Sequence, residues 1–513
     1  MAQDRPLQTV GQTEPTPLDR ARRKAFLRLL PLLFICYVIA YIDRNNIAVA
    51  KLTMPNHLDG FNDAVIGFGA GMFFIGYFLL EIPGSLIVER WSARKWICRI
   101  MVTWGIIAAA QAWVTTPTQF YFARFMLGLA EAGFYPGVII YLTHWFPRRD
   151  RAKALAWFFV GTPVAMIVSP ILSQPLINIG ELDPETGEYL IAPILGLVGW
   201  QWIFIVWGIP AVVLGIVVLL VLTDRPHQAR WLTPEERHAL EEALARDKIE
   251  HPPAAHLSWW KALGYRPVVL LALAYFCVVT GNYAVETFLP SMLKEWYKLN
   301  INDVLWLVVL PPLGSLVGQL VVGWSSDRAG ERRWHAAGPI LLAAASVAGI
   351  VATVTLDGPL GLTLALFVLA ATGLKSYLPA FWALPSLILI ESAAASSVGF
   401  INSVGNLGGF VGPYILGSLK EATGSYLPGL IYITVSMTLA ALILLSLSLG
   451  RRPALAAIPG TNREGGIVPD HEAISPRSPV SVDGTNPHWV SLTGSDPIAE
   501  PLDPIPPDEA EPS

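Results

Sequence analysis

Runs of about 20 apolar residues recur along this chain, and each is long enough to cross the hydrocarbon core of a bilayer as a helix. A chain can span a membrane only as helices or as a closed barrel, because every backbone N–H and C=O must find a partner within the bilayer. Only 14% of the residues are charged, against about 25% in soluble domains. The sequence therefore predicts an all-α polytopic membrane protein.

Twelve such runs are expected to span the membrane, six before a polar stretch at about residues 224–266 and six after it. A Thr-Pro-Glu-Glu sequence at residues 233–236 is typical of the first turn of a helix. We therefore expect two six-helix halves, at residues 26–223 and 267–450, joined by a cytoplasmic linker that contains a surface helix. The expected spans lie at about residues 27–49, 64–86, 97–115, 119–142, 153–177, 200–222, 267–289, 303–324, 337–356, 360–390, 396–418 and 427–449.

Lys and Arg are concentrated in the even-numbered connections and in the two tails, residues 1–25 and 451–513. The positive-inside rule then predicts that both termini lie in the cytoplasm. The protein is expected in the cell inner membrane. The tail at 451–513 holds twelve prolines and ten acidic against four basic residues, so we expect it to be disordered. The rest of the chain is almost neutral, which leaves no basic face for nucleic acid.

Two connections on the cytoplasmic side carry related charge patterns, one after the second expected span and one after the eighth. The acid of the first, Glu89, and the acid of the second, Asp327, lie 238 residues apart, and Pro170 and Pro413 lie 243 residues apart. Two features at nearly one offset suggest duplicated halves that rock against each other around a central site. The charges are expected to form a cytoplasmic gate, with plain positive-inside charge as the alternative; they are Glu89, Arg90, Arg94, Asp327, Arg328 and Arg332.

These two loops, together with twelve spans in two halves, resemble the major facilitator superfamily. Eight further strings, in order from about residue 25 to 450, are similar to the anion:cation symporter branch and to bacterial tartrate-type and phthalate-type permeases. The resemblance implies a transporter of small organic anions that works by alternating access. The strings include Tyr41-Ile-Asp43-Arg44-Asn45-Asn46, Glu81-Ile-Pro83, Arg124-Phe-Met-Leu-Gly128-Leu-Ala-Glu131, Gly199-Trp-Gln-Trp202, Phe381-Trp-Ala-Leu-Pro385 and Ile401-Asn-Ser-Val-Gly-Asn406.

Four charges fall inside expected spans of the first half, where a charge costs a few kcal/mol: Asp43, Arg44, Arg124 and Glu131. The arginines are candidate anion-binding groups, because the guanidinium forms two parallel bonds to a carboxylate. The acids are candidate proton carriers, and the resemblance implies the same roles. Asp43 and Arg44 diverge by about 100° on a helix, so one of them is expected to face a neighbouring helix. Fixed structural ion pairs are the alternative.

The second half adds Lys375, which the sequence places near mid-depth of its span. It is expected to be a third anion contact, and the alternative is a structural pairing with Glu286. Three cations around one site would favour a substrate with two carboxylates. Uncharged groups expected to line the site are Tyr41, Tyr77, Trp382, Asn402 and Asn406, among which the resemblance supports Tyr77 and Asn402.

No sequence motif for catalysis or for nucleotide binding occurs in the chain. Cys36, Cys98 and Cys277 lie far apart in apolar runs, so neither a metal site nor a cofactor is expected. We therefore expect a monomeric secondary transporter, not an enzyme, that imports a small organic anion, a dicarboxylate or hydroxy acid such as tartrate, with a proton. Na⁺ stays open as the coupling ion. A proton-linked exporter and a non-transporting sensor on a transporter fold are the alternatives.

Overall fold

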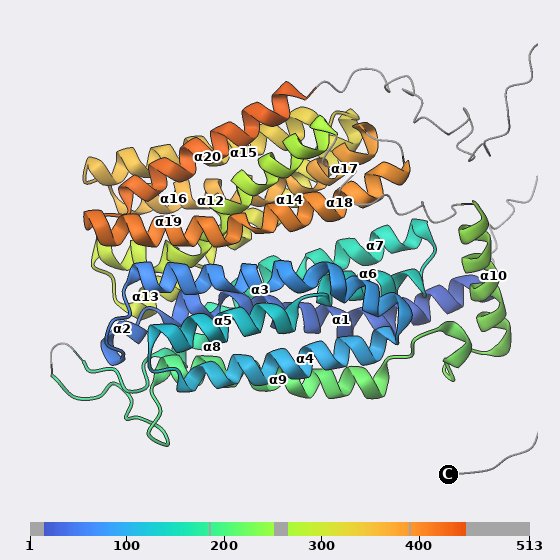
Figure 1. Cartoon of the computed structure of the whole chain (residues 1–513), viewed down its shortest axis with the longest axis horizontal. Coiled ribbons are helices and arrows are strands. Elements are labelled where there is room, and N and C mark those ends of the chain that lie inside the picture. Colours follow the sequence, from blue (N-terminus) through green and yellow to red (C-terminus); the bar gives the residue numbers. More distant parts are fainter. Residues whose placement is uncertain (1–14, 184–185, 251–264, 389–390, 448–513) are drawn as a thin grey trace, which may run out of the picture. The chain divides into compact units, whose positions relative to one another are not determined.

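The structure is a computed structural model that describes residues 15–183, 186–250, 265–388 and 391–447. Helices form almost all of its regular structure (Figure 1). The only β-bridges in the described ranges are three isolated ones in the loop between residues 178 and 198. The expected tail at 451–513 and most of the tail at 1–25 lie outside the described residues.

The first half of the chain is helical, and the linker helix α10 follows it. The expectation that a helix begins at Pro234 is confirmed. The helices are α1 (Pro17–Ala50), α2 (Met54–His57), α3 (Asp63–Arg90), α4 (Ala93–Ala110), α5 (Pro117–Glu131), α6 (Phe134–Thr143), α7 (Arg148–Phe159), α8 (Gly161–Ile177), α9 (Gly199–Val221) and α10 (Pro234–Glu250), with 3₁₀ turns at Gln111–Trp113 and Pro226–Gln228.

The second half begins with the long helix α12, which contacts α1 of the first half. Its helices are α12 (Arg266–Tyr297), α13 (Ile301–Leu307), α14 (Leu310–Ala329), α15 (Arg333–Thr355), α16 (Leu360–Ser376), α17 (Leu378–Ile388), α18 (Glu391–Asn406), α19 (Gly408–Thr423) and α20 (Leu427–Ser446).

Ten stretches of the described chain are helical, long and apolar enough to cross a membrane, which makes this a multi-pass membrane protein. The two expected spans missing from that set are 153–177 and 396–418, which the structure divides between α7 and α8 and between α18 and α19. The first is interrupted at Val160, just before Pro163, whose nitrogen cannot donate a helical hydrogen bond. The second is interrupted at Leu407, where a Cβ on Gly408 would lie 2.4 Å from the carbonyl oxygen of Phe276.

Two large clusters of buried apolar side chains form the cores. One consists of residues between Ala21 and Leu240 together with Leu305, and the other consists of residues between Val268 and Leu447. A smaller cluster between Ile47 and Phe204 lies where α1, α3, α5 and α9 meet. Each large cluster is thus built almost entirely from one part of the chain, on either side of the linker.

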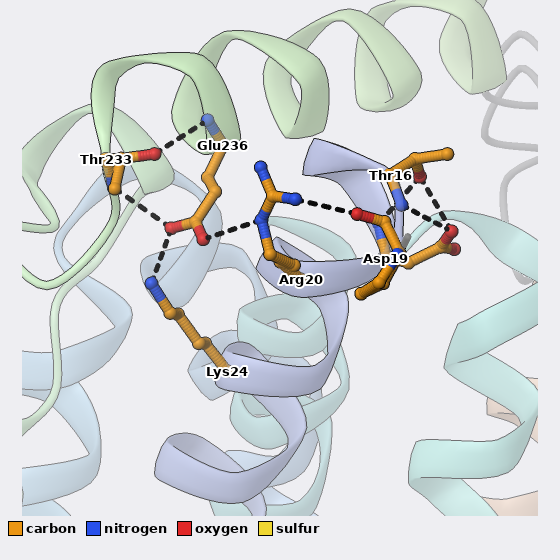
Figure 2. Close-up of polar contacts among 7 residues, drawn as sticks. Thr16, Asp19, Arg20, Lys24, Thr233 and Glu236 are labelled. Carbon is orange, nitrogen blue, oxygen red and sulfur yellow. Dashed lines mark hydrogen bonds and ion pairs between the residues drawn. The ribbon is translucent and has the colours of Figure 1, made fainter. Parts of the chain in front are cut away.

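The linker helix α10 is fastened to the start of α1 by a charged cluster, which Figure 2 shows. Glu236 Oε2 accepts bonds from Lys24 Nζ at 2.8 Å and from the backbone nitrogen of Thr233 at 3.0 Å, and Arg20 Nε lies 3.7 Å from Glu236 Oε1. The Thr233 hydroxyl accepts in turn from the backbone nitrogen of Glu236 at 3.2 Å. The ion pairs of Glu236 therefore hold the linker against the first half, and the bonds between Thr233 and Glu236 cap the start of α10.

The contact between α10 and α1 is expected to weaken in acid. Burial raises the pKa of Glu236, but the bonds from Lys24 and Thr233 and the charge of Arg20 outweigh it and hold that pKa below its usual range. A carboxyl group whose pKa is lower in the folded than in the unfolded state contributes stability above the unfolded pKa, and this is lost as the pH falls through the folded pKa. Hydrogen exchange of Pro234–Glu250, corrected for intrinsic rates, should therefore rise below about pH 4.

Glu236→Gln is expected to raise that exchange at neutral pH and to remove its dependence on acid. The matched control is Glu235→Gln, because Glu235 occupies the same helical turn but is exposed. Equal exchange in the two variants at neutral pH would show that the charge of Glu236 does not hold the linker.

Candidate functional site

The centre of the site is an ion pair between Arg44 of α1 and Glu131 of α5. Arg44 Nη2 contacts Glu131 Oε1 directly, and Arg44 Nη1 donates to the hydroxyl of Tyr283 of α12 at 3.3 Å. The Arg44 guanidinium also lies over the aromatic rings of Phe73 and Tyr77, 5.0 and 5.3 Å from their centroids. Helices from both parts of the chain thus surround this arginine.

A break between α5 and α6 places Glu131 at the last residue of its helix. Ala132 leaves the helical conformation, and Gly133 takes a φ of 86°, which a residue with a side chain rarely adopts. A broken helix within a bilayer is tolerated only where it is buried in protein or lines a cavity. The last turn of α5 carries the negative end of the helix dipole, so the positive charge of Arg44 offsets both this dipole and the carboxylate.

Arg124 of α5 lies beneath this pair and is 1% exposed. Its Nη2 donates to the backbone oxygen of Arg44 at 3.3 Å, while Nε and Nη1 have no hydrogen-bond partner among the described residues. The centroid of the Phe73 ring lies 5.4 Å from this guanidinium. A buried guanidinium with unpaired N–H groups can donate to a further acceptor.

Gly128 lies between Arg124 and Glu131 on α5, and its lack of a side chain lets α3 approach. A Cβ at this position would lie 1.9 Å from the carbonyl oxygen of Phe73. The structure therefore fills this gap with a helix. The close approach brings the Phe73 ring to both arginines.

Asp43 points away from Arg44, so the expectation that one of the two faces a neighbouring helix is confirmed. Its Oδ2 accepts from Trp104 Nε1 of α4 at 2.7 Å, and its Oδ1 accepts from Asn46 Nδ2 at 3.1 Å. The side chain is 1% exposed. Asp43 therefore joins α1 to α4 through the hydrogen bond from Trp104.

Asp43→Ala is expected to destabilise the protein by about 1–3 kcal/mol, because it leaves the buried Trp104 N–H without a partner. Asp43→Asn keeps an acceptor oxygen and should recover most of that loss. Thermal unfolding of the purified protein in detergent measures both. An Asn variant as unstable as the Ala variant would show that the charge, rather than the hydrogen bond, stabilises this contact.

Lys375 of α16 pairs with Glu286 of α12, which is the alternative that the sequence left open. Lys375 Nζ lies 2.7 Å from Glu286 Oε1 and 3.2 Å from the hydroxyl of Tyr41, which donates to Glu286 Oε2 at 3.3 Å. Both charged residues line a cavity of about 70 Å³ between helices of the two parts of the chain. Asn45, Ser169, Asn282 and Ser315 also line it.

The remaining expected site residues fall in different surroundings. Tyr77 lies beside Arg44, whereas Trp382 packs against Tyr275 and Phe381 in the second core. Asn402 donates to Glu81 Oε1 of α3 at 2.6 Å, and Ser403 donates to the other carboxylate oxygen at 3.2 Å. Asn406 is half-buried at the last residue of α18.

Where the structure describes them, the charged residues expected to form the cytoplasmic gate interact with nearby residues. The Arg94 guanidinium lies 3.9 Å from Asp224, whose other oxygen accepts from the Arg94 backbone nitrogen at 2.9 Å. Asp327 pairs with Arg332 at 2.7 Å. Arg328 lies over the ring of Trp324, and the side chains of Glu89 and Arg90 lie outside the described residues.

Sequence reasoning missed Phe73 and Tyr283 as parts of the site. Both are aromatic residues within apolar helices, where a ring facing a cation has the same sequence pattern as a ring in a core. The contact with Arg44 follows from how α1, α3 and α12 pack, so no local signal identifies it. In the described part of the chain, no group of three His, Cys, Asp or Glu side chains could hold a metal ion.

The comparison with protein families identifies the family of this chain. The family model of the Major Facilitator Superfamily matches residues 33–413 and, in a second match, residues 271–492. The chain belongs to this superfamily. The resemblance drawn from the sequence motifs is thereby confirmed, and the protein is a membrane transporter rather than an enzyme.

Relatives of this chain are named for different transport functions. A protein of Agrobacterium vitis named "Putative tartrate transporter" is 39% identical over 429 residues, which is 84% of this chain and 91% of that protein. A quinolone resistance transporter of Acinetobacter baumannii is 37% identical over 415 residues, 81% of this chain and 92% of that protein.

The fold is also shared with a solved structure. The crystal structure of a D-xylose–proton symporter superposes with a TM-score of 0.66 over 82% of this chain and 97% of that one, at 14% sequence identity. At this identity the likeness concerns the fold of the superfamily and not the substrate.

Proposed function

We propose that this protein imports a small organic anion together with a proton. The observation that carries the proposal is the buried guanidinium of Arg124, whose Nε and Nη1 have no partner, beside the Arg44–Glu131 ion pair. An entering carboxylate would bond to Arg124 and replace Glu131 on Arg44. Tyr41 and Tyr77 would contact the bound anion from α1 and α3.

The coupling follows from the competition for Arg44. While Glu131 is ionised it neutralises Arg44, and once protonated it releases that cation to the substrate. Proton and anion therefore bind together and leave together. Asp43 is proposed as the alternative proton carrier to Glu131, and Na⁺ is the alternative coupling ion.

The proposed substrate is a dicarboxylate or hydroxy acid such as tartrate. The name of the Agrobacterium vitis relative supports it, as does a third cation, Lys375, which lines a cavity. Trp382, Asn402 and Asn406 are proposed to reach the substrate in another state of the transport cycle.

The proposed topology has twelve spans in two six-helix halves, with α7 and α8 forming one divided span and α18 and α19 another. The two separate cores on either side of the linker support it. We further propose a monomer in the cell inner membrane, with both termini and the gate charges in the cytoplasm.

Export is the second candidate, and the quinolone resistance relative is the observation that favours it. In an exporter, protons would enter as the substrate leaves, so the two would move in opposite directions. Buried arginines suit anions better than cationic drugs, which is why import of an anion is the first candidate.

The test uses proteoliposomes with an internal pH dye, to which organic acids are added outside at neutral pH. Import with protons predicts acidification of the interior by one acid of the panel, whereas antiport predicts alkalinisation. Silence for every acid, together with no thermal stabilisation by any of them, would contradict an organic anion as the substrate.

A further inference from the structure

The Lys375–Glu286 pair has a composition that matches the Arg44–Glu131 pair. Each consists of one cation and one carboxylate on different helices, and in each pair the carboxylate contacts the cation directly. The first pair belongs to α1 and α5, and the second belongs to α12 and α16. The side chains of Lys375 and Glu286 are only 12% and 8% exposed.

The two pairs meet along the contact between α1 and α12. Tyr41 and Arg44 lie on one face of α1, three residues apart, and Glu286 and Tyr283 lie on one face of α12 with the same spacing. Tyr41 bonds to Glu286, and Arg44 bonds to Tyr283. The pairs are therefore about one helical turn apart, roughly 5 Å along the helices.

The second pair also borders an opening. Glu286 and Lys375 line the cavity between the two parts of the chain, and Asn45, Asn282, Ser169 and Ser315 offer hydrogen bonds there. A purely structural ion pair needs no such cavity. The cavity thus gives a small molecule access to Lys375, one helical turn from the Arg44–Glu131 pair.

We propose that Lys375 binds the second carboxylate of a dicarboxylate substrate and that Glu286 carries a second proton. This inference rests on the proposed function. The entering carboxylate takes the place of Glu286 on Lys375, just as the first takes the place of Glu131 on Arg44. Each displaced glutamate accepts one proton from the outer solution and releases it inside when it pairs with its cation again.

The balance of charge is then fixed. One dianion enters with two protons, so no net charge crosses the membrane. A substrate with one carboxylate displaces Glu131 only and enters with one proton, which is also neutral. The number of protons per substrate is therefore set by the number of carboxylates that the substrate carries.

Few other charged or titratable groups face Glu286. Lys375 comes from α16 and Tyr41 from α1, and Arg44 and Tyr283 lie one turn away. Three further groups near α12 bond elsewhere. Lys420 of α19 pairs with Glu295, the Asp303 carboxylate of α13 accepts from Asn300 Nδ2, and the Tyr426 hydroxyl donates to Asp63.

The experiment compares L-tartrate with L-threonate, which has the same carbon chain but a hydroxymethyl group in place of one carboxylate. Uptake of each radiolabelled acid and internal acidification are measured in the same proteoliposomes, with the membrane potential set by K⁺ and valinomycin. Wild-type protein should take up two protons per tartrate and one per threonate. An inside-negative potential should change neither rate.

Glu286→Gln should lower the ratio for tartrate from two protons to one and leave the ratio for threonate at one. Tartrate uptake would then carry one negative charge inward, so an inside-negative potential should slow it. An unchanged ratio of two protons would overturn the assignment of Glu286.

A second variant guards against misfolding, because removing one partner of a buried ion pair is more destabilising than replacing both. The double variant Lys375→Met, Glu286→Gln removes both charges together. It should lose tartrate uptake by about tenfold or more and keep threonate uptake. Equal loss of both acids would overturn the assignment of Lys375.

Failure of the proposed function has a different signature. If wild-type protein transports neither acid, the substrate class is wrong and the second carboxylate site falls with it. If it transports tartrate with one proton in both wild-type and Glu286→Gln protein, only the inference on Glu286 fails.

Discussion

Arg124→Ala is expected to abolish both binding and transport of the substrate anion. The guanidinium is buried, and two of its nitrogens have no partner among the described residues, so the substrate is expected to supply the bonds that they lack. Losing such a buried, charge-assisted contact costs about 2–5 kcal/mol, or about 30-fold to several thousand-fold in affinity. Ligand-induced thermal stabilisation measures binding, and uptake into proteoliposomes measures transport.

The matched control is Arg99→Ala. Arg99 lies in α4, where its guanidinium stacks on Trp96, 4.0 Å from the ring centroid, and takes no part in the site. It should leave binding within about twofold of wild type. Arg124→Lys keeps the charge but loses the planar fork, so it should recover folding without recovering full affinity. Full affinity in Arg124→Ala would contradict the anion site.

Glu131→Gln is expected to separate binding from coupling. The neutral amide mimics the protonated acid, so Arg44 is available to the substrate at every pH and binding should persist. Exchange of labelled for unlabelled substrate should continue as well. Accumulation driven by a pH gradient should be lost. In wild-type protein, a gradient of one pH unit is worth about 1.4 kcal/mol for each coupled proton, which corresponds to about tenfold accumulation.

Glu295→Gln is the control for this prediction. Glu295 lies near the C-terminal end of α12, where it pairs with Lys420 and is partly exposed. Its neutralisation should therefore leave accumulation unchanged. Glu131→Gln protein that still accumulates substrate under a pH gradient would show that another group carries the proton. Accumulation lost in Asp43→Asn but kept in Glu131→Gln would assign that group to Asp43.

Much of the candidate site could be predicted because a charge inside an apolar run is costly. Asp43, Arg44, Arg124 and Glu131 stand out for this reason alone, and the seven-residue spacing of the last two places them on one face of α5. The angle between successive residues on a helix predicted that either Asp43 or Arg44 would face a neighbouring helix, and the structure shows that it is Asp43. These inferences depend on local geometry, which a sequence specifies.

The division of five spans between consecutive helices was harder to predict, because hydropathy measures whether a segment prefers lipid and not whether its helix is continuous. Residues 153–177 and 396–418, for example, are apolar enough to be read as single spans. The interruption at Val160 lies just before Pro163, and the interruption at Leu407 lies beside the close approach of Gly408 to α12. That approach exists only in the folded protein.

The sequence by itself determined the class of the protein, because the length of its apolar runs leaves no fold other than a membrane-spanning helical one, and it identified the buried charges. Only the tertiary structure decided which cation pairs with which acid. Lys375 and Glu286 are 89 residues apart in the chain, and Tyr41 joins them from a third helix. Pairing energies depend on distances between helices, which hydropathy and spacing along one helix do not contain.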